Sequence, residues 1–156
     1  MPELEGTVDG RGMKIGVVVA SFNAFVTGGL LQGALTALAG AGVDDPIVLR
    51  VAGAFELPVA VRALAEAGCD GVVALGAVIE GETDHYEHVA TQAIGGLQQV
   101  AVQTGVPVGL GVLTARQADQ ARARSLPGPG NKGAEAAEAV VRAADALRRL
   151  RSLPGG

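Results

Sequence analysis

Residues 14–20, KIGVVVA, and residues 71–79, GVVALGAVI, decide the fold class of this chain. Each is an uninterrupted apolar run rich in β-branched residues, without the alternation that marks a strand with one face in water. Such runs are typical of strands that are buried on both faces, as in a parallel sheet. Residues 46–51 (PIVLRV) and 107–114 (PVGLGVLT) predict two further strands.

Segments with helical spacing of apolar residues separate these strands, and glycines such as Gly68 and Gly105 end them. Strands that alternate with helices imply crossover connections and a parallel sheet that is covered on both faces. We therefore expect one α/β domain over residues 1–156, with a three-layer α/β/α architecture and a four-stranded parallel sheet. Residues 4–8 predict an extra N-terminal strand, paired either in this chain or with a neighbour, and residues 152–156 a disordered tail. The expected helices span residues 26–41, 57–67, 85–104, 118–124 and 133–151, with a loop at 52–56.

The composition excludes several classes of protein. Hydrophobic residues make up 49% of the 156 residues and charged residues 18%, which excludes a disordered chain. A net charge of −4 implies no broad basic face for nucleic acid or for an anionic membrane. The single cysteine, Cys69, has no intrachain disulfide partner, which suits a reducing compartment. With an acidic start and no clean apolar span, the expected location is the cytoplasm.

The strand ends are the expected place for a ligand, because open parallel sheets bind ligands beyond the carboxyl ends of their strands. The chain has only three phenylalanines and one tyrosine, and Phe22 and Phe55 both fall in strand-end segments. Their placement favours a flat ligand held by stacking. Packing in the core is the alternative interpretation of either side chain.

Both histidines, His85 and His88, lie at the predicted start of the helix over 85–104. Their spacing is compatible with a metal pair, but neither a cysteine nor an HExxH pattern accompanies them. We expect His85 to face the strand-end cleft and to transfer protons, since its ordinary pKa of about 6.5 suits that role. We expect His88 to pack or to form hydrogen bonds.

Residues 128–133, GPGNKG, match the glycine spacing of a dinucleotide-binding loop. That fingerprint needs a preceding strand and a following βαβ unit, and here the loop follows a short helix, so we interpret the match as a decoy. Lys132 with Arg124 is either an anion-binding pair at a helix start or two ordinary exposed cations.

Taken together, several motifs resemble the 6,7-dimethyl-8-ribityllumazine synthases of riboflavin biosynthesis, in family order along nearly the whole chain. They are SFN at 21–23, GAFELP at 53–58, GAVI at 76–79, GET at 81–83 with HY at 85–86, GVLT at 111–114, QA at 120–121 with Arg124, and NKG-x-EAA at 131–137.

The resemblance implies a flavodoxin-like sheet and a homopentamer with active sites between subunits, which some members build into icosahedral shells. The implied reaction condenses 5-amino-6-(D-ribitylamino)uracil with 3,4-dihydroxy-2-butanone 4-phosphate and releases phosphate and water. It implies no metal, no organic cofactor, no nucleic acid and no membrane, and riboflavin synthase as a possible partner.

The resemblance also implies a role for each matching residue. Phe22 would stack on the pyrimidine, and His85 would shuttle protons. The ring and the ribityl chain would contact Asn23, Ala54, Phe55, Glu56, Val78, Ile79, Leu110 and Lys132. The phosphate would be held by Gly81, Glu82, Thr83 and Arg124.

This sequence departs from the family pattern at Ala52, Glu80, Asp84 and Leu110, where the family usually has Pro, Arg, Thr or Pro, and in some members Phe. Glu80 and Asp84 place negative charge beside the expected phosphate loop. They motivate the second hypothesis, a weakly active or non-catalytic protein that binds lumazine or flavin and forms shells. A third interpretation is an unrelated flavodoxin-like interaction domain.

Overall fold

The computed structural model describes residues 1–80 and 85–155. It confirms a parallel sheet of β1 (Ile15–Ala20), β2 (Ile47–Val51), β3 (Gly71–Ile79) and β4 (Val108–Ala115), in the order β2-β1-β3-β4. The second and fourth strands begin one residue later than predicted. Their expected first residues, Pro46 and Pro107, lack the amide hydrogen that a sheet ladder needs.

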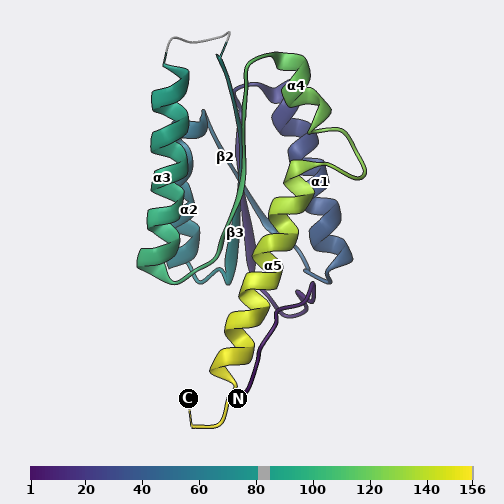
Figure 1. The fold of residues 1–156 in the computed structure, drawn as a ribbon, viewed down its shortest axis with the longest axis vertical. Helices are drawn as coiled ribbons and strands as arrows, with labels where there is room; N and C mark the ends of the chain where they lie inside the picture. The colour runs from purple at the N-terminus through teal and green to yellow at the C-terminus, as the bar shows by residue number, and fades with distance from the viewer. Residues whose placement is uncertain (81–84, 156) are drawn as a thin grey trace.

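Helices cover both faces of the sheet, which confirms the three-layer prediction (Figure 1). On one face lie α1 (Ala24–Gly40) and α5 (Lys132–Arg151), and on the other α2 (Leu57–Glu66) and α3 (Tyr86–Thr104). The short α4 (Ala118–Ala123) connects β4 to α5. No helix in the described part of the chain is both long and apolar enough to cross a membrane.

Both faces of β1 are buried, as its continuous apolar run predicts. Ile15, Val17 and Val19 pack into one core cluster with residues of α1 and α5. Val18 and Ala20 pack into the other, with residues of α2 and α3. Alternate residues of one strand therefore supply two separate cores.

Small residues bring α1 and α5 close together. A Cβ added to Gly133 would collide with the backbone of Leu30, so these helices meet backbone to backbone. Contacts of this kind account for some of the 24 glycines of the chain.

The helix ends follow the predicted signals. Gly42 (φ 86°), Gly68 (φ 98°) and Gly105 (φ 72°) adopt left-handed conformations at or just beyond the ends of α1, α2 and α3. The expected loop at 52–56 instead contains one turn of 3-10 helix, η1 (Ala54–Glu56). After α5, Ser152 donates hydrogen bonds through its amide and its hydroxyl to the carbonyl of Arg148.

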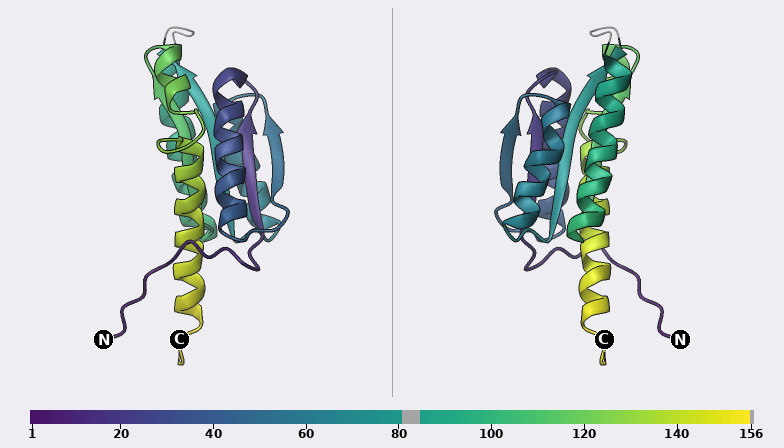
Figure 2. Two further views of the ribbon diagram at one scale, coloured as in Figure 1. Left: turned by 90° about the vertical axis from the view of Figure 1, so that its right-hand side faces the viewer. Right: turned by 90° about the vertical axis from the view of Figure 1, so that its left-hand side faces the viewer.

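The extra N-terminal strand at residues 4–8 is not formed within this chain. The segment instead runs beside the last turns of α5 and away from the body of the subunit (Figure 2). Its direction is decided by contacts with α5, because Thr7 is bonded to Asp145 rather than to a strand edge. Pairing with a neighbouring copy, the other expected arrangement, stays a prediction.

Candidate functional site

A cleft of about 260 Å³ lies at the carboxyl ends of β1 and β3. The strand order reverses between these two neighbours, since β2 follows β1 on one side and β3 lies on the other. Doubly wound sheets bind ligands at this switch point, because the helices that follow the two strands diverge to opposite faces. The cleft is lined by Phe22, Asn23, Gly53, Ala54, Phe55, Glu56, Ala77, Val78, Ile79 and Val89.

The turn after β1 places Phe22 and Asn23 at the cleft. The amides of Ser21 and Phe22 donate to the carbonyls of Val51 (2.8 Å) and Ala52 (2.9 Å), so this turn stays bonded to the segment after β2. Asn23 adopts the left-handed conformation (φ 61°, ψ 48°), which asparagine tolerates better than most residues.

The side chain of Asn23 joins β1 to β3. Its Nδ2 donates to the carbonyl of Ala77 at 2.9 Å. The backbone carbonyl of Asn23 accepts hydrogen bonds from the amides of Val26 and Thr27. As a result α1 begins two residues earlier than predicted. Phe22 is left at the rim with 69% of its surface exposed, so it is not a core residue of the single chain.

The η1 turn forms the second wall of the cleft. Glu56 Oε1 accepts a hydrogen bond from the amide of Gly53 at 2.9 Å, which closes the turn on itself. Ala54 is buried, whereas Phe55 is 63% exposed. One accepted bond leaves the carboxylate of Glu56 with capacity for further donors, because a carboxylate has about four acceptor positions.

The floor and the third wall are apolar. Ala77, Val78 and Ile79 at the end of β3 are buried, and Val89 comes from the first turns of α3. Gly53 and Ala77 fell within the quoted motifs but were given no role in the site, and Val89 was not singled out. The sequence did carry a signal for Val89, because it lies four residues after His85 and residues i and i+4 share one helix face. A histidine expected at the cleft therefore predicts that Val89 lies near the cleft as well.

His85 occupies the N-cap position of α3 and is exposed. Its carbonyl accepts from the amide of Val89 at 2.9 Å, and Val89 lines the cleft. The orientation of the His85 side chain toward the cleft stays a prediction. His88 is also exposed, and the expected packing role for it is not seen in the single chain. Gly81, Glu82, Thr83 and Asp84 lie outside the described residues.

Four of the expected site residues that the structure describes are not among those that line this cleft in the single chain: His85, Leu110, Arg124 and Lys132. Leu110 is exposed in the middle of β4, opposite Ala74, where it borders a shallow groove beside α3. Arg124 and Lys132 lie together where α4 meets α5, since the amide of Lys132 donates to the carbonyl of Arg124 at 2.9 Å. The ammonium group of Lys132 pairs with Glu135 at 2.9 Å.

The GPGNKG stretch has a structural role that sequence reasoning missed. Asn131 is buried, and its Nδ2 donates to the carbonyls of Gly29, Ser125 and Leu126 at 3.0–3.1 Å. Its Oδ1 accepts from the amide of Ala134 and caps α5. The loop follows α4 rather than a strand, which confirms that the dinucleotide pattern is a decoy.

Glu80, the acidic departure beside the expected phosphate loop, forms an ion pair with Arg116 at 3.9 Å. Arg116 follows β4 and was not singled out from the sequence. Both side chains are more than half exposed, so the pair is weak, yet it places a compensating positive charge beside Glu80. Within residues 1–80 and 85–155, no group of three or more His, Cys, Asp or Glu side chains is arranged to hold a metal ion.

Comparison with known proteins identifies the family of this chain. The family model for 6,7-dimethyl-8-ribityllumazine synthase matches residues 12–148. A 6,7-dimethyl-8-ribityllumazine synthase from Kineococcus radiotolerans is 50% identical over 157 aligned residues, which cover 99% of this chain and 96% of the relative. The protein of the same name from Levilactobacillus brevis is 44% identical, with 98% of this chain and 99% of the relative covered. The chain therefore belongs to the 6,7-dimethyl-8-ribityllumazine synthase family.

Proposed function

We propose that this protein is the transferase that condenses 5-amino-6-(D-ribitylamino)uracil with 3,4-dihydroxy-2-butanone 4-phosphate to give 6,7-dimethyl-8-ribityllumazine. Phosphate and water are released, in the penultimate step of riboflavin biosynthesis. The observation that carries the proposal is the cleft between β1 and β3, which offers an exposed aromatic ring, a carboxylate and an apolar floor in a member of this family.

The described cleft suits the pyrimidine substrate. The ring of Phe22 is available for stacking on a flat uracil, and Val78 and Ile79 provide an apolar surface beneath it. Asn23, Ala54, Phe55 and Glu56 border the space for the ribityl chain. Glu56 accepts hydrogen bonds from ribityl hydroxyls with the acceptor positions that Gly53 does not use.

His85 moves the protons of the reaction. Amine attack on the ketone forms an imine and expels one water, and elimination then releases phosphate. Ring closure follows when the ribitylamino nitrogen attacks the carbonyl that the elimination generates, and it expels a second water. Each of these steps needs a proton to be moved, and an imidazole can do so near neutral pH. An amine and a ketone condense readily once aligned, so much of the acceleration comes from holding the two substrates in place.

The active site is shared between subunits. The cleft of a single chain, at about 260 Å³, is slightly smaller than the roughly 300–1,000 Å³ typical of ligand pockets. Leu110, Arg124 and Lys132 lie on other surfaces of the same chain, which supports their acting on a neighbour's cleft. In this arrangement Arg124 pairs with the phosphate beside Gly81, Glu82 and Thr83.

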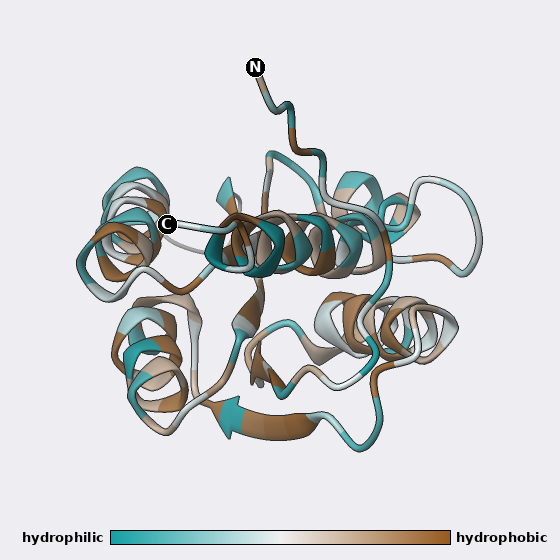
Figure 3. Cartoon of the chain, turned by 90° about the horizontal axis from the view of Figure 1, so that it is seen from below, coloured by the Kyte–Doolittle hydropathy of each residue, from teal (hydrophilic) through white to brown (hydrophobic). Residues whose placement is uncertain are grey.

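Exposed apolar surface supports the homopentamer. The strand β2 lies at the edge of the sheet (Figure 3). Four of its five residues are exposed, including the apolar Ile47, Val48 and Leu49. An exposed apolar edge strand invites pairing with another chain, and residues 4–8 of a neighbour are a candidate for that partner. Val59 and Val102 add further exposed apolar surface on α2 and α3. The proposal also includes the closure of pentamers into an icosahedral shell. It further includes a cytoplasmic location for the protein.

The test mixes the purified protein with both substrates and follows lumazine fluorescence against the uncatalysed reaction. We expect acceleration that saturates in both substrates. His85→Ala should lower turnover by roughly 100-fold, at the lower end of what a positioned acid or base contributes. His88→Ala, three residues further along α3 and also exposed, is the matched control and should keep turnover. A background rate from folded protein that binds the pyrimidine would instead favour the non-catalytic alternative.

A further inference from the structure

The segments that follow the four strands carry mostly negative charge. These segments are 21–23, 52–56, 80–84 and 116–117, and their acidic residues are Glu56, Glu80, Glu82 and Asp84. Arg116 is the only arginine or lysine among them. The carboxyl ends of parallel strands meet at one edge of a sheet, where carboxylates repel an anionic ligand. Arg116 is therefore the one permanent cation that follows a strand of this chain.

The pairing of β3 with β4 places Arg116 beside Glu80. The last residues in register on these parallel strands are Ile79 and Ala115. Glu80 and Arg116 come next, and Arg116 Nε lies 3.9 Å from Glu80 Oε2. Because Ile79 lines the cleft, this pair begins one residue beyond the cleft floor. The sheet itself thus fixes the pair beside the site already described.

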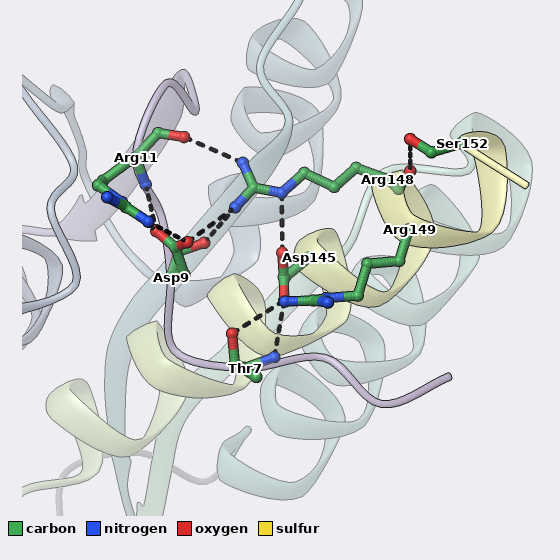
Figure 4. Close-up of polar contacts among 7 residues, drawn as sticks. All are labelled: Thr7, Asp9, Arg11, Asp145, Arg148, Arg149 and Ser152. Carbon is green, nitrogen blue, oxygen red and sulfur yellow. Dashed lines mark hydrogen bonds and ion pairs between the residues drawn. The ribbon is translucent and has the colours of Figure 1, made fainter. Parts of the chain in front are cut away.

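The guanidinium of Arg116 has its donors available. Its distance of 3.9 Å from Glu80 is too long for a hydrogen bond, and it forms none within residues 1–80 and 85–155. Arg148 and Arg149, by contrast, each donate at 2.8 Å to the buried carboxylate of Asp145 (Figure 4). The planar fork of an arginine matches two oxygens of a phosphate. Arg116 can therefore bind an anion without losing a hydrogen bond.

The ion pair of Arg116 with Glu80 is weak enough to be exchanged. The two side chains are 85% and 52% exposed, and ion pairs in such positions contribute little to stability. A phosphate monoester near neutral pH carries nearly two negative charges and three acceptor oxygens. It therefore competes well with one carboxylate for the guanidinium.

We propose that Arg116 binds the phosphate group of 3,4-dihydroxy-2-butanone 4-phosphate, and that Glu80 is the counter-ion which the phosphate displaces. The identity of this ligand rests on the proposed function. The phosphate then lies between Arg116 of one subunit and Arg124 of its neighbour. Arg116 sets the affinity for this substrate and leaves the pyrimidine, which has no phosphate, unaffected.

The first experiment measures steady-state kinetics for both substrates in the full chain. Arg116→Gln should raise KM for the butanone phosphate about five- to tenfold, while kcat and the KM for the pyrimidine stay within about twofold, because binding is lost equally from ground and transition states. Arg116→Lys keeps the charge and should hold the first KM within about threefold of the natural chain. Arg62→Gln is the matched control, because Arg62 is also exposed and paired with a glutamate, Glu66 on α2.

The second experiment repeats Arg116→Gln in a chain that carries Glu80→Gln. If Arg116 only offset the charge of Glu80, its loss would have no effect once that charge is gone. We expect instead that KM for the butanone phosphate rises at least fivefold in this background as well, and less at high salt, where exposed charges are screened. An unchanged KM in the Glu80→Gln background would overturn the proposal. An equal rise in the KM for the pyrimidine would also overturn it, since it would assign Arg116 to the structure of the strand end.

The third experiment keeps this proposal separate from the proposed reaction. Inorganic phosphate is titrated into the natural chain and into Arg116→Gln by isothermal titration calorimetry, and the variant should bind it about five- to tenfold more weakly. Affinity for 6,7-dimethyl-8-ribityllumazine, which has no phosphate, should be the same in both. A natural chain that does not accelerate the condensation would contradict the proposed function, and the phosphate titration would then decide the role of Arg116 by itself. Equal phosphate affinity in the two chains, or no binding by either, would overturn that role.

Discussion

Phe22→Ala separates ligand stacking from fold stability. The ring lines the cleft but is 69% exposed, so its removal deprives the core of little packing. Substitutions at such surface positions usually change the free energy of unfolding by less than about 0.5 kcal/mol. Stacking of a nucleobase on an aromatic ring contributes about 1–3 kcal/mol by alanine substitution. Because about 1.4 kcal/mol corresponds to a factor of ten, the dissociation constant should rise roughly 5- to 150-fold.

The assay for this prediction is a fluorescence titration with 6,7-dimethyl-8-ribityllumazine, combined with urea unfolding. Phe25→Ala is the matched control, because Phe25 is also half exposed and lies three residues away in the first turn of α1, outside the cleft. We expect the control to bind the ligand as the natural chain does. Unchanged affinity in Phe22→Ala, or an equal loss in Phe25→Ala, would refute the stacking role.

Three further predictions follow from the geometry. Asn131→Ala removes a helix cap and leaves buried carbonyls without a donor, so the free energy of unfolding should fall by about 2–4 kcal/mol and Tm by roughly 5–15 °C; a Tm within one or two degrees of the natural chain would contradict this role. Hydrogen bonds from Thr7, Arg149 and Arg148 hold the pKa of Asp145 well below its usual range, and Arg11 lowers that of Asp9 to about 2. Because both pKa values are lowered by folding, the stabilisation is complete above about pH 5 and is lost progressively as the pH falls toward the lowered values. The difference in Tm between the natural chain and Asp145→Asn should therefore be constant from pH 7 to 5 and shrink below pH 5. Glu80→Arg puts a second cation beside Arg116 and should lower KM for the butanone phosphate about two- to fivefold at low salt, with a smaller effect at high salt; an unchanged or higher KM would show that the Glu80 charge does not act on the phosphate.

Local patterns predicted most of the fold. The apolar runs of β1 and β3 indicated strands buried on both faces, and the glycines after α2 and α3 indicated where those helices end. These signals are local, because hydrophobic periodicity and the conformational freedom of glycine act within a few residues. The family motifs likewise directed attention to Phe22, Asn23 and Glu56, which the structure brings to one cleft.

Contacts between distant parts of the chain decided the rest. Thr7 and Asp145 are 138 positions apart. Nothing in the sequence around either residue predicts that the buried carboxylate of Asp145 binds residue 7, so that the segment at 4–8 does not form a strand in this chain. Asn131 was noticed for the glycines around it, whereas its importance lies in the carbonyls that its side chain bonds. Two of them, Ser125 and Leu126, belong to the same loop, and only the packing of α1 against α5 brings the third, Gly29, within reach. The separation of Arg124 and Lys132 from the cleft is likewise a matter of where α4 and α5 pack. The sequence by itself determined the elements, their order and the chemistry at the strand ends, because these depend on local preference and burial. Only the tertiary structure decided which of those groups share one surface, because that depends on how the layers pack.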